Sequence, residues 1–394
     1  MPNPVRFVGL FLVFSLAAAW PNGAAAQADS LLAAEQYFQR GNELFEEGDL
    51  MQAIDYYTQA LVFAPKHTRA RVNRGLVHFK RNQWSRASDD FDKYLPSHPN
   101  DTVILVHRGQ AAYMLQNFSD ATHYLSLALQ LAEDADVRLD RGLAYFAARN
   151  WEAALQDFRE ATRLAPRMGE AWLGYGNTLQ EMGDYENALQ LYQQAHALDS
   201  GDPRPTFNMG VVLCKLYKYE EAIEQFDAVL RTHDRHALAL AHRAACHFHL
   251  GKFEEAAADA NRALTLAPDL PEAYHALGLL EMEKGDFALA ERIFTEALDF
   301  EPDNSELLAG RGLARLKLRK NEDALEDLDA AIAYDTRNGA AYYIRASLRK
   351  KMHNDVGACE DYRQANKYGY LPFPDMDGTV FCEGYPDGIE AKKH

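Results

Sequence analysis

Long apolar segments are scarce in this sequence of 394 residues. The longest apolar run covers residues 7–20, which are too few to cross a bilayer as a helix. Arg6 precedes the run, residues 21–23 break it, and Ala26-Gln27-Ala28 fits the small-residue rule for a leader cleavage site. We therefore expect residues 1–28 to be a signal peptide cleaved before Asp29. The mature chain would be exported, either periplasmic or secreted, and would have no integral membrane span. The alternative is an uncleaved amino-terminal anchor.

Positive charge is also scarce. The 41 lysine and arginine residues are outnumbered by 58 aspartate and glutamate residues, which gives a formal net charge of −17. A surface with this excess repels phosphate backbones and anionic lipid. We therefore expect no nucleic acid partner, and solubility is the simplest reason for the charge.

Sequence patterns typical of catalysis are nearly missing. No serine, histidine and acid constellation and no phosphate-binding loop is present. Asp375-Met376-Asp377-Gly378-Thr379 matches the nucleophile motif of haloacid-dehalogenase-type phosphatases, but the chain ends shortly afterwards, at His394. That motif has to open a large α/β domain, so we interpret the match as a coincidence and expect no enzyme.

One repeated unit fills most of the chain instead. Residues 271–304 have the pattern of two amphipathic helices, at 272–284 and 287–300, which Gly285-Asp286 separates and Pro302 ends. A small residue in the middle of the first helix recurs at a constant interval, which is shorter by one position only between Gly109 and Gly142. These residues are Gly41, Gly75, Gly109, Gly142, Gly176, Gly210, Ala244, Gly278, Gly312 and Ala346. An alanine follows each of them at one fixed distance, from Ala53 in the first unit to Ala358 in the last.

This period resembles that of the tetratricopeptide repeat family. The residues that carry the resemblance in one unit are Tyr274, Gly278, Ala290, Phe294, Ala297 and Pro302. The resemblance implies an all-α fold, an α-solenoid superhelix of about ten helix-turn-helix repeats. The repeats would cover residues 34–372 and start near 34, 68, 102, 135, 169, 203, 237, 271, 305 and 339. Residues 29–33 would be a lead-in. Residues 373–394 would be a capping tail, with Tyr370, Leu371, Phe373 and Phe381 covering the last unit.

One departure from the family pattern predicts an ion pair. Arginine replaces the usual leucine before the small residue at Arg40, Arg74, Arg108, Arg141, Arg243, Arg311 and Arg345. Five of these units carry an aspartate at the same place on the second helix: Asp90, Asp157, Asp259, Asp327 and Asp361. We expect each arginine to pair with the aspartate of its own unit, with Tyr56 and Tyr124 as alternative partners of Arg40 and Arg108. Pairing between neighbouring units agrees less well with the sequence. Such a pair would fix helix register.

The resemblance also implies that the first helices line a concave groove. The candidate peptide-binding residues on this face are Asn42, Phe45, Asn73, Phe79, His107, Tyr113, Asp140, Phe146 and Asn177. Amide side chains can bond both backbone groups of a peptide, and aromatic side chains supply anchoring area. We expect an extended or helical peptide there. The alternative is that these side chains only pack between helices. The family's carboxylate clamp would fall on Phe38, Asn42, Asn73, Val103 and His107, where only the two asparagines match, so we expect no such clamp.

The histidine and cysteine residues raise two further questions, whether the chain binds a metal and whether it forms disulfide bonds. His233, His236, His242, His247 and His249 lie near Cys246, and three of these side chains share a helical face, which zinc or copper can use. Scattered helical histidines are the simpler interpretation, and we expect neither a metal nor a cofactor. We predict that a disulfide between Cys359 and Cys382 pins the tail, worth about 3 kcal/mol. At Cys214 and Cys246 we favour free buried thiols over a contact.

Together these patterns predict a non-enzymatic scaffold. It would bind a protein or peptide partner in the concave groove, in assembly or maintenance of a cell-envelope complex. The alternatives are a substrate-presenting or regulatory subunit of an enzyme complex, or metal binding through the histidines between His233 and His249.

Overall fold

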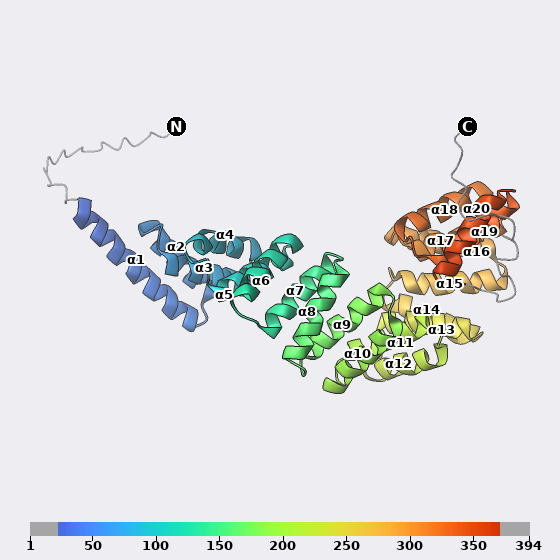
Figure 1. Ribbon diagram of the computed structural model, residues 1–394, viewed down its shortest axis with the longest axis horizontal. Coiled ribbons are helices and arrows are strands. Elements are labelled where there is room, and N and C mark those ends of the chain that lie inside the picture. Colours follow the sequence, from blue (N-terminus) through green and yellow to red (C-terminus); the bar gives the residue numbers. More distant parts are fainter. Residues whose placement is uncertain (1–22, 371–394) are drawn as a thin grey trace, which may run out of the picture. The chain divides into compact units, whose positions relative to one another are not determined.

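The computed structural model describes residues 23–370, and within that range the chain forms helices and no strand. The predicted signal segment up to residue 22 and the predicted tail at 373–394 lie outside the described residues. The helices (Figure 1) are α1 Gly23–Glu46, α2 Leu50–Phe63, α3 Thr68–Lys80, α4 Trp84–Tyr94, η1 Leu95–Ser97, α5 Thr102–Met114, α6 Phe118–Leu131, α7 Ala135–Ala147, α8 Trp151–Leu164, α9 Gly169–Met182, α10 Tyr185–Leu198, α11 Pro203–Lys215, α12 Tyr219–Thr232, α13 Ala237–His249, α14 Phe253–Leu266, α15 Pro271–Lys284, α16 Phe287–Phe300, α17 Ser305–Lys317, α18 Asn321–Tyr334, α19 Gly339–Lys351 and α20 Asp355–Lys367.

These helices confirm the all-α repeat predicted from the sequence. The helices expected at 272–284 and 287–300 are α15 and α16, and the other units repeat this pair. The lead-in predicted at 29–33 is not a separate segment, because α1 runs through it without a break.

Turn chemistry sets where the helices begin and end. The side chain of Asp184 accepts a hydrogen bond from the backbone N–H of Asn187 and so caps the start of α10. Asp286 caps α16 in the same way. Gly183 and Gly285, just before these caps, adopt positive φ angles of 85° and 81°, which glycine tolerates without strain.

The two helices of a unit cross where the small residue lies. A Cβ atom added to Gly210 on α11 would lie 2.6 Å from Cε1 of Phe226 on α12. Phe226 is fully buried, so the ring has no room to move away. In the next unit Ala244 occupies the glycine position, and the smaller Ala260 stands where the ring would be. The first helix therefore needs a small residue because the second helix carries a large one.

All five predicted arginine–aspartate pairs form. Arg141 donates to Asp157 through Nε and Nη2, both at 2.7 Å, and Asp157 is only 1% exposed. The equivalent two-bond pairs are Arg74–Asp90, Arg243–Asp259, Arg311–Asp327 and Arg345–Asp361. The hydrogen bond to Asp259 raises the pKa of Arg243 despite partial burial. Planar guanidinium groups suit this two-bond geometry.

Arginines also pair between units, an arrangement that the sequence favoured less. Nη1 of Arg243 donates to Asp227 of the preceding unit at 2.5 Å, and Nη1 of Arg345 donates to Asp329 at 2.6 Å. The five N–H donors of a guanidinium allow one arginine to bond two carboxylates. In these units the arginine therefore joins the second helices on both sides of its own first helix.

The two arginines whose units lack an aspartate at the repeated position on the second helix behave differently from each other. Arg108 bonds Asp92 of the preceding unit at 2.7 Å and Asp120 on the second helix of its own unit at 3.3 Å. Its guanidinium also lies 4.6 Å from the ring centre of Tyr124. The tyrosine alternative thus holds for Arg108 as a stacking contact. Arg40 instead donates to Glu43 on its own helix, since no second helix precedes the first unit among the described residues.

The pattern of helix contacts curves the stack. First helices of successive units contact one another, as α3 does with α5 and α13 with α15, whereas second helices are joined by no contact of comparable extent within residues 23–370. The first helices therefore lie on the inside of the curve. We call the surface they form the inner face.

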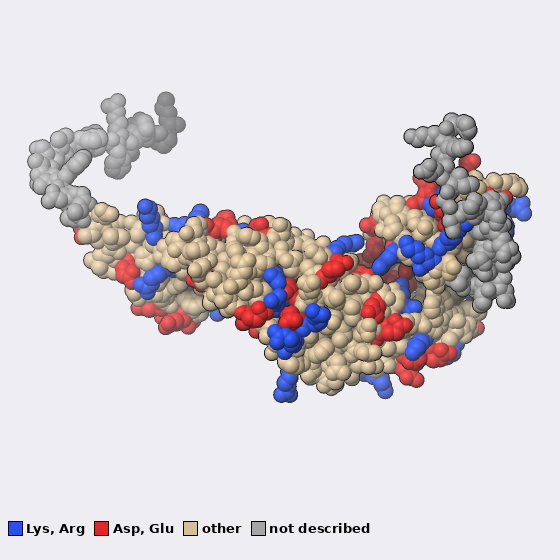
Figure 2. Space-filling model, viewed as in Figure 1, with Lys and Arg blue, Asp and Glu red and all other residues tan. Residues whose placement is uncertain are grey.

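The chain divides at Pro166 into two compact parts. The N-terminal part contains α1 to α8 and the C-terminal part α9 to α20, and in each part antiparallel helix pairs stack side by side (Figure 1). Figure 2 shows basic and acidic side chains interspersed on the drawn face of both parts. On that face, the excess of negative charge is not gathered in one patch.

We predict that Asp157→Asn destabilises the fold by roughly 3 kcal/mol or more, because it leaves the guanidinium groups of Arg141 and Arg138 without their buried carboxylate. The control is Glu160→Gln, which breaks an exposed pair with Arg163 and should cost less than about 1 kcal/mol. Urea denaturation followed by circular dichroism measures both. Equal small losses would mean that the buried pairs do not hold the units together.

Candidate functional site

Two of the predicted groove residues, Asn42 and Asn73, meet on the inner face of the N-terminal part. The Oδ1 atom of Asn42 accepts hydrogen bonds from the Tyr57 hydroxyl at 2.8 Å and from Nδ2 of Asn73 at 2.9 Å. These bonds orient both amides. Within the described part of the chain, the amide N–H groups of Asn42 and the amide oxygen of Asn73 make no further hydrogen bond.

The same arrangement recurs in the C-terminal part. Oδ1 of Asn177 accepts from the Tyr192 hydroxyl at 2.9 Å and from Nδ2 of Asn208 at 2.8 Å. Burial raises the pKa of Tyr192, so its hydroxyl remains a donor. Sequence reasoning found Asn177 as a site residue but missed the tyrosine behind it, although the same spacing joins Tyr57 to Asn42.

A third polar pair lies between these two in the sequence. Nε2 of Gln110 on α5 donates to Oδ2 of Asp140 on α7 at 2.7 Å. We call Asn42–Asn73, Gln110–Asp140 and Asn177–Asn208 the amide pairs. They occupy the first, third and fifth junctions between units, and the first two pairs lie in the N-terminal part. The partners of all three pairs have nearly the same separation in the sequence. This regular spacing could have indicated the pairs, but the groove prediction did not use it.

Asp140 differs from the other predicted site residues because it is charged. Burial raises the pKa of Asp140 more than the hydrogen bond from Gln110 lowers it, and Asp136 raises it further. No cation pairs with this carboxylate among residues 23–370. It is thus available to a donor from a partner.

The predicted aromatic anchors are partly used inside their own units. Phe79 packs on Trp84 with ring centroids 5.0 Å apart, and Phe146 packs on Trp151 at 5.1 Å. Tyr113 packs on the ring that opens its second helix in the same manner. One side of each half-buried ring therefore packs between helices, as the alternative to peptide binding predicted.

The two other predicted groove residues with rings, Phe45 and His107, also lie on first helices. Phe45 is exposed, and the ammonium group of Lys80 lies 5.3 Å from its ring centre. His107 lies 4.8 Å from the ring of Phe79 and bonds the carbonyl oxygen of Val103 through Nδ1.

The histidines of α13 have other roles than metal binding. His236 accepts a hydrogen bond from the backbone of Ala239 and caps the helix, and His249 stacks on Tyr219 at 4.6 Å. His242 stacks on Phe226. No group of three or more candidate ligands is placed to hold a metal in the described part of the chain.

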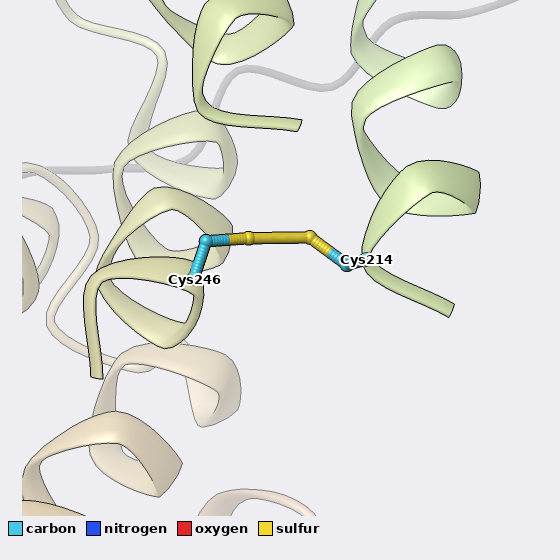
Figure 3. The surroundings of a disulfide bond; sticks show 2 residues. All are labelled: Cys214 and Cys246. Atoms are coloured by element: carbon cyan, nitrogen blue, oxygen red, sulfur yellow. A yellow bond between two sulfur atoms is a disulfide. The ribbon is translucent and has the colours of Figure 1, made fainter. Parts of the chain in front are cut away.

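A disulfide joins Cys214 on α11 to Cys246 on α13 (Figure 3). Their Cα atoms are 6.7 Å apart, within the range that a disulfide spans, and Cys246 is fully buried. The preference for free thiols at these positions is thus wrong. Neighbouring first helices lie close enough to bring the two thiols together. Cys359 is buried on α20, whereas Cys382 lies outside the described residues, so that pairing stays a prediction.

The inner face of the C-terminal part is bridged between units that are not neighbours. Nζ of Lys215 lies 3.4 Å from Oε1 of Glu306, and this lysine holds the pKa of Glu306 down to about 2. Nη2 of Arg337 donates to the carbonyl oxygen of Glu181 at 2.9 Å, and the Tyr217 hydroxyl donates to that of Gly369 at 3.3 Å. Tyr370, one of the predicted capping residues, packs on Tyr343 at 5.8 Å.

Comparison with known proteins identifies the family to which these helical repeats belong. The tetratricopeptide repeat family matches residues 38–102, 139–203, 208–271 and 275–335, so the chain belongs to that family. No helix among the described residues is long and apolar enough to cross a membrane.

Two curated relatives are similar over much of this chain. Human DnaJ homolog subfamily C member 7 is 25% identical over 349 residues, which cover 84% of this chain and 66% of that protein. The wheat Hsp70-Hsp90 organizing protein is 24% identical over 272 residues, which cover 68% of this chain and 41% of that protein. The chain thus matches at most about two thirds of their length.

One solved structure supports the fold, and a second has partial similarity. The Cut9–Hcn1 hetero-tetramer of the APC/C has a TM-score of 0.53 at 14% identity, covering 89% of this chain and 76% of that chain. A tetratricopeptide repeat protein from Parabacteroides merdae has a TM-score of 0.49 at 19% identity, covering 63% and 96%.

We predict that His242 makes stability depend on pH. Burial lowers the pKa of His242 to about 4, beside Phe226 and Phe207, whereas the unfolded value is near 6.5. Protonation favours the unfolded chain, so the stabilisation is present above pH 6.5 and is lost as the pH falls toward 4. The loss should be on the order of 2 kcal/mol.

Urea denaturation of the wild type and of His242→Gln, each at pH 7 and at pH 4.5, measures this loss. The variant cannot gain the charge, so its stability should fall less between the two pH values than that of the wild type. The same fall in both proteins would contradict the assignment to His242.

Proposed function

We propose that this chain is a non-enzymatic protein-interaction scaffold that binds an extended peptide segment of a partner along the inner face. The observation that carries the proposal is the set of amide pairs. Each pair lies on the first helices, and Tyr57 or Tyr192 orients the two asparagine pairs from behind. An oriented amide offers a donor and an acceptor, which complement the C=O and N–H groups of an extended backbone.

The spacing of the amide pairs defines the length of peptide that they hold. Asn42–Asn73 and Gln110–Asp140 lie two units apart in the N-terminal part. Packed helices lie roughly 8–10 Å apart, so the two pairs are about 16–20 Å apart along the stack. An extended peptide rises about 3.3 Å per residue, so about five or six residues would connect the two points.

The relatives support a role in protein interaction. The name of the wheat relative describes an organiser of two other proteins, and this chain matches two fifths of its length. Binding by a preformed surface needs no covalent step. The side chains of the inner face supply hydrogen bonds and aromatic area for that purpose.

We further propose that the chain is exported and acts in the assembly or maintenance of a cell-envelope complex. The leader-like sequence at residues 1–28 supports export. The disulfide between Cys214 and Cys246 supports it as well, because such bonds persist in oxidising compartments. Amino-terminal sequencing of the protein recovered from its cells should begin at Asp29. A chain that begins at residue 1 or 2 would contradict the cleavage.

Peptide selection tests the scaffold proposal. The purified chain would be used to select from a phage-displayed library of random dodecapeptides, and the affinity of one selected peptide would be measured by fluorescence anisotropy. Asn73→Ala should weaken binding about tenfold, as expected for the loss of a hydrogen-bonding amide. Asn261→Ala is the matched control, because that exposed amide on α14 bonds its own helix backbone.

Two results would contradict the proposal. Equal affinity of Asn73→Ala and wild type would remove the inner face of the N-terminal part as the site. Failure of the wild type to select any peptide would remove peptide binding as the function.

A further inference from the structure

Three polar contacts close the inner face of the C-terminal part, and we call them the latch. Each joins one of the first two repeat units of that part to one of its last two, with α13 to α16 between them in the sequence. The contacts are Lys215–Glu306, Arg337–Glu181 and Tyr217–Gly369, with 3.4, 2.9 and 3.3 Å between the bonded atoms. Packing between neighbouring units does not account for them.

The latch is polar, so it can open without exposing a core. The side chains of Lys215 and Glu306 are 53% and 61% exposed, and ion pairs of this exposure are weak. The buried apolar clusters of this part join successive units, and within residues 23–370 none contains residues of both α11 and α17. Opening would therefore break polar contacts that water can replace.

The latch lies beside the third amide pair, Asn177–Asn208. Glu181 follows Asn177 on α9 by one turn, and Lys215 follows Asn208 on α11 by two turns. Residues at these separations share a face of their helix. Burial and, to a smaller extent, the charge of Glu181 raise the pKa of Tyr192, the residue that orients Asn177. The latch thus stands at the approach to this amide pair.

A peptide backbone has no room to pass between groups that are in contact. Strands that share hydrogen bonds lie about 4.8 Å apart, so an extended segment between two facing surfaces needs a gap of roughly 10 Å. The bonded atoms of the latch are 2.9 to 3.4 Å apart. A segment from the middle of a partner chain cannot be threaded end-on, so it reaches Asn177 and Asn208 only when the latch opens.

We propose that the latch is an autoinhibitory contact, which excludes a partner from the Asn177–Asn208 pair until it opens. This inference rests on the proposed function, because the excluded ligand is a peptide of the kind that the amide pairs would bind. It concerns the C-terminal part alone. Repeat units of this kind pack only on their neighbours, so small changes at successive junctions add up to a wide opening between the ends of the part.

The opening is measured first without a ligand. Spin labels carried by an unnatural amino acid would replace Gln190 and Glu326, exposed residues on α10 and α18, and double electron–electron resonance would measure their separation. We call Glu306→Gln/Arg337→Ala the latch-broken variant. It should gain a population at distances longer by about 5–10 Å, the widening that an extended segment needs.

The matched control is Glu170→Gln/Arg235→Ala. Glu170 forms an ion pair of similar exposure with Arg204, but the two residues lie on neighbouring first helices, α9 and α11. Arg235 has the place before α13 that Arg337 has before α19. The control removes the same charges from the same part and should keep the wild-type distances.

The wild type at high salt gives a second measurement, which holds even if the variant fails to fold. About 1 M salt screens an exposed pair such as Lys215–Glu306, so the population at longer distances should grow. If the wild type at high salt and the latch-broken variant both keep the closed distances, the latch is overturned and the scaffold proposal stands.

Peptide selection then tests whether the latch guards the amide pair. The random dodecapeptide library would be selected on the latch-broken variant, and affinities would be measured by fluorescence anisotropy. Peptides that lose affinity when Asn208→Ala is added to that variant should bind it at least about fivefold more tightly than they bind wild type or control, because the closed state reduces apparent affinity. Peptides that depend on Asn73 should bind all three proteins equally.

The outcomes separate this inference from the scaffold proposal. Equal affinity of Asn208-dependent peptides for wild type and latch-broken variant would overturn the latch alone. A selection that yields only Asn73-dependent peptides would overturn it as well and would support the scaffold. An absence of any selected peptide would overturn both.

Discussion

The stack depends on one charged group that recurs in seven of the ten units, the arginine that precedes the small residue of the first helix. Where aspartates stand on the second helices before and after it, the guanidinium joins three helices, as Arg243 does with Asp227 and Asp259. First helices of successive units contact one another, whereas second helices make no contact of comparable extent among residues 23–370, so the first helices lie on the inside. The inner face follows from that asymmetry.

The first amide pair takes no part in these contacts. Register is fixed by arginine and aspartate between helices, and close packing by glycine and a buried ring, so Asn42 and Asn73 are not needed for either purpose. Their amides are nevertheless held in place by Tyr57. A polar group that is oriented yet incompletely bonded is the feature that distinguishes a binding surface from a packing surface.

The sequence predicts the fold closely because the repeat is local. Helix limits such as Phe287–Phe300 follow from Asp286 and Pro302, which act within one turn of the chain. The Arg141–Asp157 pair was also predictable, since both residues belong to one unit. What the sequence did not reveal involves contacts across units: the bond from Arg243 to Asp227, the disulfide of Cys214 with Cys246, and the contact of Lys215 with Glu306. These depend on how tightly successive units curve, which no single repeat specifies.

Hydrogen exchange measured by mass spectrometry, on the chain with and without a peptide selected from the library, tests most directly whether the inner face is the binding surface. We expect slower exchange in α3, α5 and α7, the first helices that carry Asn73, Gln110 and Asp140, and unchanged exchange in α4, α6 and α8. Slower exchange confined to the second helices would place the partner on the outer surface and contradict the central claim.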